Sequence, residues 1–140
     1  MSFEKITKTD NDDTRPCMIL VNFDKKEMTT IKSVSTFTGI RDRIELNGKH
    51  GKCIISDIIE GKIEPGDEKT FSNKAVIFNN IDSRKVSGFI DGLKKMRMRR
   101  PYTAMVTETS KNWTLEVLIQ NLIQENQALA SGKEAEHGEI

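Results

Sequence analysis

Cysteine is scarce in this chain of 140 residues, and its two thiols, Cys17 and Cys53, lie far apart. Two cysteines are too few for a disulfide scaffold. His50 and Cys53 together supply only two of the four ligands that a structural zinc ion takes. Both thiols therefore fit best as small buried hydrophobic side chains, and we expect neither a metal site nor a cofactor.

Long apolar runs and an excess of charge of one sign are also missing. No segment approaches the roughly 18 apolar residues of a membrane span, and the start of the chain contains no apolar stretch typical of a signal peptide. Lys and Arg number 22 against 21 Asp and Glu, which gives a net charge of +1. We therefore expect a cytoplasmic protein with no membrane partner, whose electrostatic contacts are local.

The sequence contains none of the common catalytic patterns. No glycine-rich segment leads into the Lys-Ser/Thr step of a phosphate-binding loop. None of the serines lies in a nucleophile-elbow pattern, and neither histidine is placed to act as a base. We predict no catalytic residue and favour a protein that is not an enzyme.

What the sequence does contain is a pattern that recurs after about 58 residues. Residues 18–24 and 76–82 each place an apolar run before an Asn-x-Asp step, and apolar residues at helical spacing follow both. In the first half the pattern predicts a strand at 18–23, a helix from Asp24 to Gly39 and an edge strand at 40–46, with a short helix favoured over a strand at 53–59. In the second half it predicts a strand at 75–78, a helix from Asp82 or Ser83, a strand at 102–107 and a long terminal helix with an apolar seam to Leu129.

This order of elements predicts one α+β domain at 17–130, built from halves at about 17–62 and 74–130, between disordered tails at 1–16 and 131–140. We favour a ferredoxin-like four-stranded sheet made from a duplicated β-α-β-(α) unit with an extra C-terminal helix. A doubly wound parallel sheet is the alternative. Because both apolar strands are apolar on both faces, the terminal helix or a second subunit must cover the face that the two long helices leave open.

The end of the chain resembles a known family. The stretch Tyr-Thr-Ala-Met-Val-Thr-Glu-Thr-Ser-Lys-Asn-Trp-Thr-Leu at 102–115, followed by a helix rich in Glu and Gln, is similar to the end of a small family of uncharacterised bacterial proteins, a domain of unknown function. The likeness covers about Ala75 to Leu129. It departs at Glu108 and Ser110, where the family pattern has Pro and Asn. The resemblance implies a fold and a bacterial source, and it lends no catalytic residue.

Two groups of residues are candidate binding sites. The first is a basic face between Arg84 and Arg100, where seven cations stand against one anion, Asp91. This density suits phosphate groups, although the same residues also complement a helix C-terminus, and Tyr102 is the only aromatic ring beside them. Its members are Arg84, Lys85, Lys94, Lys95, Arg97, Arg99 and Arg100.

The second group consists of polar residues that follow the predicted strands, where helix N-termini can receive an anion. We expect the Asn-x-Asp residues of the two halves to share one edge of the sheet, although helix capping also explains them. Trp113 fits better as a staple for the terminal helix than as a ligand contact. The group comprises Asn22, Asp24, Asn80, Asp82, Thr107, Thr109, Asn112 and Trp113.

From the sequence, the preferred function is a non-catalytic binding or regulatory module that acts through protein association, with a protein partner or a second copy of the chain. Nucleic-acid binding by the Arg84 to Arg100 face is the first alternative. Binding of an anion or small ligand at the sheet edge is the second.

Overall fold

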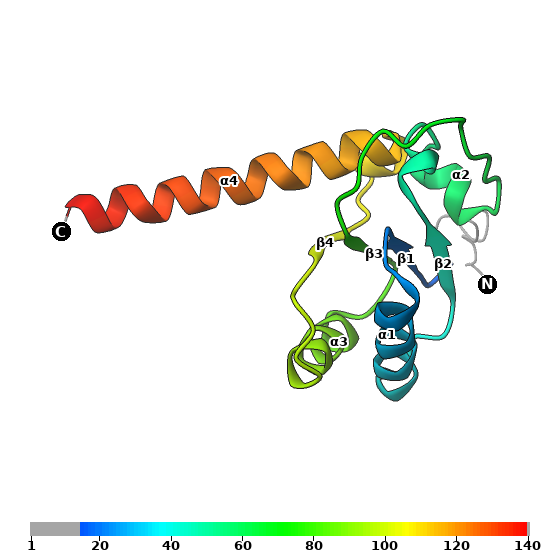
Figure 1. Cartoon of the computed structure of the whole chain (residues 1–140), viewed down its shortest axis with the longest axis horizontal. Coiled ribbons are helices and arrows are strands. Elements are labelled where there is room, and N and C mark those ends of the chain that lie inside the picture. Colours follow the sequence, from blue (N-terminus) through cyan, green and yellow to red (C-terminus); the bar gives the residue numbers. More distant parts are fainter. Residues whose placement is uncertain (1–14, 140) are drawn as a thin grey trace, which may run out of the picture.

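The computed structural model describes residues 15–139, with side chains up to Ala128, and it centres on one four-stranded sheet (Figure 1). The strands are β1 (Cys17–Val21), β2 (Arg43–Leu46), β3 (Ala75–Asn79) and β4 (Tyr102–Met105), in the order β2-β1-β3-β4. The central pair β1 and β3 is antiparallel, whereas each outer strand runs parallel to its neighbour. The prediction that the two apolar strands lie side by side at the centre is confirmed.

Helices cover both faces of this sheet. On one face α1 (Lys25–Thr38) packs against α3 (Ser83–Lys95), and on the other lie α2 (Ile55–Ile59) and α4 (Leu115–Glu139) (Figure 1). Two short 3₁₀ turns, η2 (Gly48–His50) and η3 (Ser110–Asn112), precede α2 and α4. The terminal helix and α2 therefore cover the face that α1 and α3 leave open.

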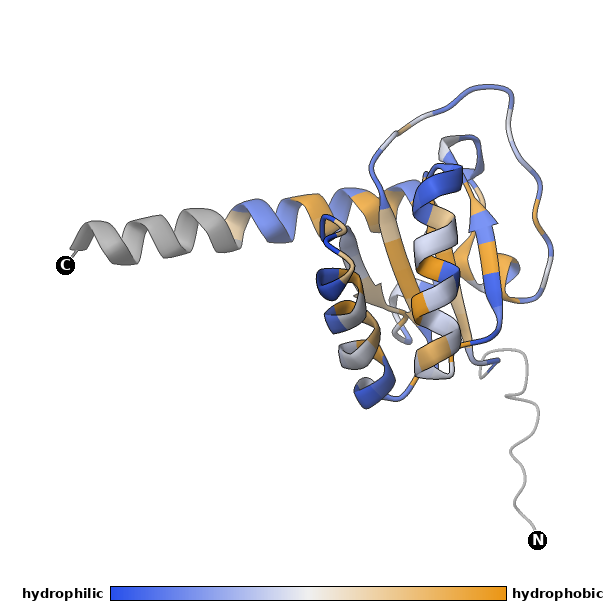
Figure 2. Ribbon diagram, turned by 60° about the horizontal axis from the view of Figure 1, so that its bottom comes forward, coloured by the Kyte–Doolittle hydropathy of each residue, from blue (hydrophilic) through white to orange (hydrophobic). Residues whose placement is uncertain are grey.

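Two hydrophobic clusters result, one on each face of the sheet. Met18, Leu20, Val76 and Phe78 point toward α1 and α3, where the rings of Phe78 and Phe89 meet edge to face. Alternate residues of the same strands, Cys17, Ile19, Val21, Ala75 and Ile77, point toward α2 and α4. Because both central strands are fully buried, they read as continuous apolar runs, and Figure 2 shows them between amphipathic helices.

Several local predictions are confirmed by the hydrogen bonds. Asp24 and Glu27 form a capping box at the start of α1, and Gly39 ends that helix in the left-handed conformation. Within the ambiguous apolar segment at 53–59, residues 55–59 form the helix α2, and Cys53 and Ile54 precede it. The predicted edge strand at 40–46 begins later, at Arg43, because Ile40 still donates its N–H to the Ser35 carbonyl of α1.

The topology differs from both predicted layouts. In a ferredoxin-like sheet a strand separates the two strands of each β-α-β unit, whereas here β1 and β2 pair directly, as do β3 and β4. A doubly wound sheet would be wholly parallel, which the antiparallel β1–β3 pair contradicts. The fold is an α+β mixed sheet with helices alternating along the chain.

The two halves meet through reciprocal contacts. Ile19 pairs with Ile77 at the middle of the antiparallel register. Ile55 donates its N–H to the Trp113 carbonyl over 2.9 Å, and Leu115 donates its N–H to the Cys53 carbonyl over 2.8 Å. The predicted tails, 1–16 and 131–140, lie almost wholly outside the described side chains and stay predictions.

Candidate functional site: a basic groove between β4 and α4

The polar residues that follow the strands do not gather at one edge. Because β1 and β3 run in opposite directions, Asn22 and Asp24 lie at one end of the sheet and Asn80 and Asp82 at the other. The prediction that these pairs share an edge is therefore wrong. It assumed that the two central strands were parallel.

At their separate positions, these side chains hold the backbone in place. Asn22 has a left-handed φ of 65°; its side-chain amide donates to the Asn73 carbonyl and accepts from the Gly48 N–H, both over 2.9 Å. Asp24 belongs to the capping box of α1, and Asp82 accepts the Arg84 N–H at the start of α3. Asn80 has the same left-handed conformation as Asn22, with φ 54°.

The turn after β4 is also held by its own side chains. The hydroxyl groups of Thr107 and Ser110 accept each other's backbone N–H over 3.0 and 2.9 Å. Thr109 and Asn112 flank this turn, and the Asn112 amide donates to the Glu108 carbonyl. Trp113 packs against the cluster under α2 and α4, the position expected of a staple.

The seven basic residues fall into two groups. Arg84 and Lys85 lie at the N-terminal end of α3, and Lys94 lies at the other end, about 15 Å away along the helix. A compact turn then ends α3, in which Met98 donates its N–H to Leu93 and Arg97 adopts a left-handed φ of 60°. The segment from Lys94 to Arg100 thus concentrates five cations next to the start of β4.

Beside this segment lies a groove of about 840 Å³, which we call the basic groove. Its lining comprises Phe23, Glu27, Ser72, Lys74, Arg99, Arg100, Pro101, Tyr102 and Thr103, together with Leu122, Glu125 and Asn126 of α4. Lys74 is already paired with Glu27 at 2.6 Å. Both arginines are exposed, and no hydrogen bond or ion pair joins either one to another residue within 15–128. Two unpaired guanidinium groups at the start of an edge strand suit an anionic partner.

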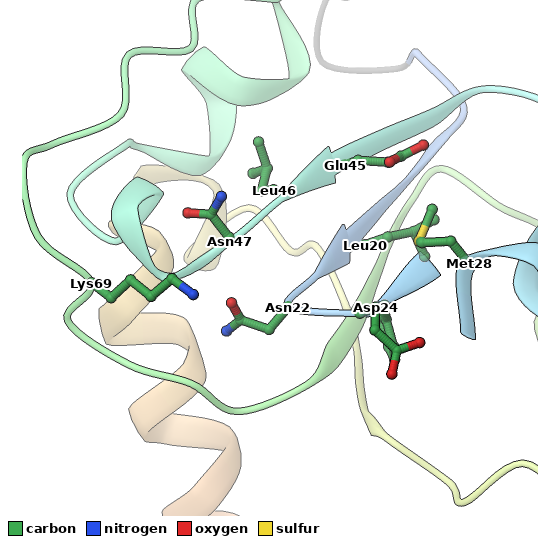
Figure 3. Close-up of a pocket in the computed structure, with 9 residues that line it drawn as sticks. Leu20, Asn22, Asp24, Met28, Glu45, Leu46, Asn47 and Lys69 are labelled. Atoms are coloured by element: carbon green, nitrogen blue, oxygen red, sulfur yellow. The ribbon is translucent and has the colours of Figure 1, made fainter. Parts of the chain in front are cut away.

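A second pocket, of about 470 Å³, opens at the same end of the sheet (Figure 3). Phe23 lines both pockets. Most of its polar side chains already have partners. Asn47 accepts the Lys49 N–H over 2.8 Å, and Glu45 lies 3.3 Å from the ammonium group of Lys32. The basic groove is therefore the stronger candidate site.

The opposite end of the sheet is closed by Arg15. Its guanidinium group binds both carboxylate oxygens of Asp42, over 2.6 and 2.8 Å, and donates to the Ile59 carbonyl. The hydrogen bonds from Arg15 lower the pKa of Asp42. Burial raises the pKa of Cys17 to about 11, which keeps this thiol protonated and fits a structural role.

Within the described part of the chain, no three His, Cys, Asp or Glu side chains cluster closely enough to hold a metal ion. Among the same residues, no helix combines the length and apolar character that crossing a membrane requires.

Sequence reasoning found the two arginines of the groove but missed Lys74 and the α4 residues opposite them. Lys74 immediately precedes β3, and parallel pairing brings it beside the start of β4, where Tyr102 donates its N–H to the Lys74 carbonyl. If we had assumed that the two strands of the second half pair in parallel, the sequence would have predicted Lys74 beside the start of β4.

Comparison with known proteins gives a family for the second half. No curated protein and no solved structure matches the chain. A family model described as a domain of unknown function matches from Lys74 to the middle of α4, which confirms the resemblance seen in the sequence. Residues 74–129 are a DUF3783 domain.

Proposed function

We propose that the protein is a non-catalytic binding module that acts through protein association, with the basic groove as its contact surface. The observation that carries the proposal is the pair Arg99 and Arg100, exposed at the groove and without a partner among the described side chains. A charged side chain kept free beside an edge strand and a helix is available to a partner.

The basic groove is a different surface from the one that the sequence suggested. Apolar excess on the central strands favoured association through an open sheet face, but α2 and α4 cover that face. A homodimer through the sheet face therefore loses its support. The basic groove is open to a partner, and it is larger than the neighbouring pocket beside Asn22.

Two finer statements belong to the same proposal. The protein acts in the cytoplasm, since its thiols are unpaired. Its halves derive from one duplicated unit, which the reciprocal Ile55–Trp113 and Leu115–Cys53 hydrogen bonds support.

Nucleic-acid binding is the second candidate, favoured by the five cations between Lys94 and Arg100. Tyr102 is the one aromatic ring that lines the groove beside them, so stacking of successive bases has little support. This candidate predicts binding of a single-stranded RNA or duplex DNA oligonucleotide whose affinity falls steeply with added salt.

The test selects peptides from a random phage-displayed library on the immobilised full-length chain. The double variant Arg99→Glu with Arg100→Glu is screened in parallel, and Arg84→Glu with Lys85→Glu serves as a control with the same change in charge at the far end of α3. Peptides that bind the wild type and the control, but not the groove variant, support the proposal. A selection without enriched peptides overturns it, as does equal loss of binding in both variants.

A further inference from the structure

The two edges of the sheet are protected differently. On β2, Arg43 donates to the Ser35 hydroxyl and Glu45 lies beside Lys32, so charged side chains tied to α1 flank that edge. On β4 the residues are Tyr102, Thr103, Ala104 and Met105, none of them charged. Natural sheets use charges at an edge to prevent pairing with another chain, so β4 lacks a safeguard that β2 has.

The backbone of β4 is free to accept a further strand. Tyr102 and Val106 donate their N–H groups to β3, and in a parallel pair alternate residues face the same neighbour. Thr103 and Met105 therefore direct their N–H and carbonyl groups away from the sheet. No backbone hydrogen bond joins either residue to another segment within the described range, and Met105 is 47% exposed.

The basic groove opens at the start of this free edge, at the end of the sheet where β1 ends and β3 and β4 begin. Thr103 lines it from β4, and Leu122 and Glu125 line it from α4. In Figure 1, α4 runs on past β4, the last strand of the sheet. Arg99 and Arg100 line the groove just before β4 begins.

We infer that β4 receives an extended acidic segment of a partner protein, which adds to the sheet as a fifth strand beside β4 and reaches the basic groove where β4 begins. This inference rests on the proposed function and names the chemistry of its partner. Main-chain hydrogen bonds to Thr103 and Met105 hold the segment, and its carboxylates pair with Arg99 and Arg100.

Charge complementarity selects this occupant over a second copy of the chain. The four residues of a second β4 carry no carboxylate, and an antiparallel copy would bring only Glu108, three residues after its strand, toward the two arginines. An acidic segment neutralises both guanidinium groups, so its affinity weakens as ionic strength rises.

The experiment uses the full chain and a capped peptide of alternating glutamate and valine, with an alternating lysine and valine peptide as the control. Binding is followed by fluorescence anisotropy, and strand addition by protection of the Thr103 and Met105 amides from hydrogen exchange. Two substitutions of Met105 separate the contribution of its backbone N–H to peptide binding from that of its side chain. Met105→Pro removes an N–H that points away from β3, whereas Met105→Ala keeps it. A third probe, the acidic peptide with alternate amides N-methylated, removes the same bonds without changing the protein.

The expected result is binding of the acidic peptide alone, weakened about tenfold or more by Met105→Pro and by N-methylation but not by Met105→Ala. Binding that needs Arg99 and Arg100, yet survives both Met105→Pro and N-methylation, overturns strand addition and leaves the proposed function standing. Absence of binding by the acidic peptide, while library peptides still need the arginines, overturns the acidic specificity alone.

Two further outcomes would overturn the inferred occupant. If light scattering shows a dimer that Met105→Pro abolishes, a second copy occupies the edge. If an RNA or DNA oligonucleotide binds through the arginines and the acidic peptide does not compete, the groove serves nucleic acid.

Discussion

The first and second halves of the molecule share a plan and differ at their outer parts. Each half has a buried central strand, a helix over one face, a parallel edge strand and a helix over the other face. The last helix is 5 residues long in the first half and 25 in the second. The edge strand is flanked by charges in the first half and uncharged in the second. The shared parts build the core, whereas the basic groove lies where the halves differ.

The largest effects should come from the parts that the halves share. Ile58 of α2 and Leu118 of α4 occupy corresponding positions in one cluster, and both are buried. We expect Ile58→Ala and Leu118→Ala each to lower the free energy of unfolding by about 2–5 kcal/mol, through lost burial and a cavity. Urea denaturation measures both values. A loss under about 1 kcal/mol at either position would show that its helix is not part of the core.

Substitutions at the contact between α1 and α3 should change stability by a smaller amount, and a second glycine of α3 provides the control. A Cβ atom on Gly92 would lie 2.5 Å from a methyl group of the buried Val34, whereas one on Gly88 would lie 3.5 Å from Thr38. Gly92→Ala should therefore destabilise the protein by about 1–3 kcal/mol. Gly88→Ala should be neutral or stabilise it by up to about 1 kcal/mol, because alanine favours helix. Thermal unfolding of the two variants decides the matter, and the same sign for both would contradict the close packing.

Substitutions in the turn after α3 can separate an effect on stability from an effect of losing one positive charge. Arg97 occupies the left-handed position at which helices favour glycine. Arg97→Gly should raise the free energy of unfolding by about 0.5–1 kcal/mol, as measured by chemical denaturation, while removing one cation beside the basic groove. Arg97→Ala removes the same cation without relieving the backbone, so the two variants should have different stabilities. Equal stability would show that the turn carries no strain.

The smallest effect concerns the ion pair that the first half makes with Arg15. The pKa of Asp42 is lower in the folded protein than in the unfolded chain, so its contribution is present above the ordinary aspartate pKa and is lost as pH falls through the folded value. Both side chains are more than a third exposed, which limits Asp42→Asn to a loss of about 1 kcal/mol or less at pH 7. Denaturation at several pH values should show the variant approaching the wild type below about pH 4. A gap that stays constant into acid would contradict this role.

The local features of this fold could be predicted because they depend on neighbouring residues. Asp24 and Glu27 predicted a capping box, and the apolar runs around Ile19 and Ile77 predicted two central strands. Gly39 predicted the end of α1. Each of these signals lies within a few positions of the structure that it specifies.

Strand direction and the groove could not be predicted in the same way. An apolar run buried on both faces has the same pattern in a parallel and an antiparallel pair, so nothing near Ile19 shows that β3 runs against β1. That ambiguity placed Asn80 and Asp82 at the wrong end of the sheet. Lys74 and Glu125, which are 51 positions apart, meet in the groove only through the long-range packing of α4 on the sheet.

The antiparallel junction of β1 with β3 has a consequence for the DUF3783 segment. All five residues of β3 are buried, and β1 satisfies the side of β3 that β4 leaves open. Without residues 15–73, the backbone N–H and carbonyl groups on that side of β3 would have no partners. The strand Ala-Val-Ile-Phe-Asn would then be an exposed edge prone to pairing with another chain. Two isolated segments would pair antiparallel through this edge, with Ile77 of one opposite Ile77 of the other. In the full chain, residues 15–73 take the place of that second copy and are covalently linked to the segment that they cover.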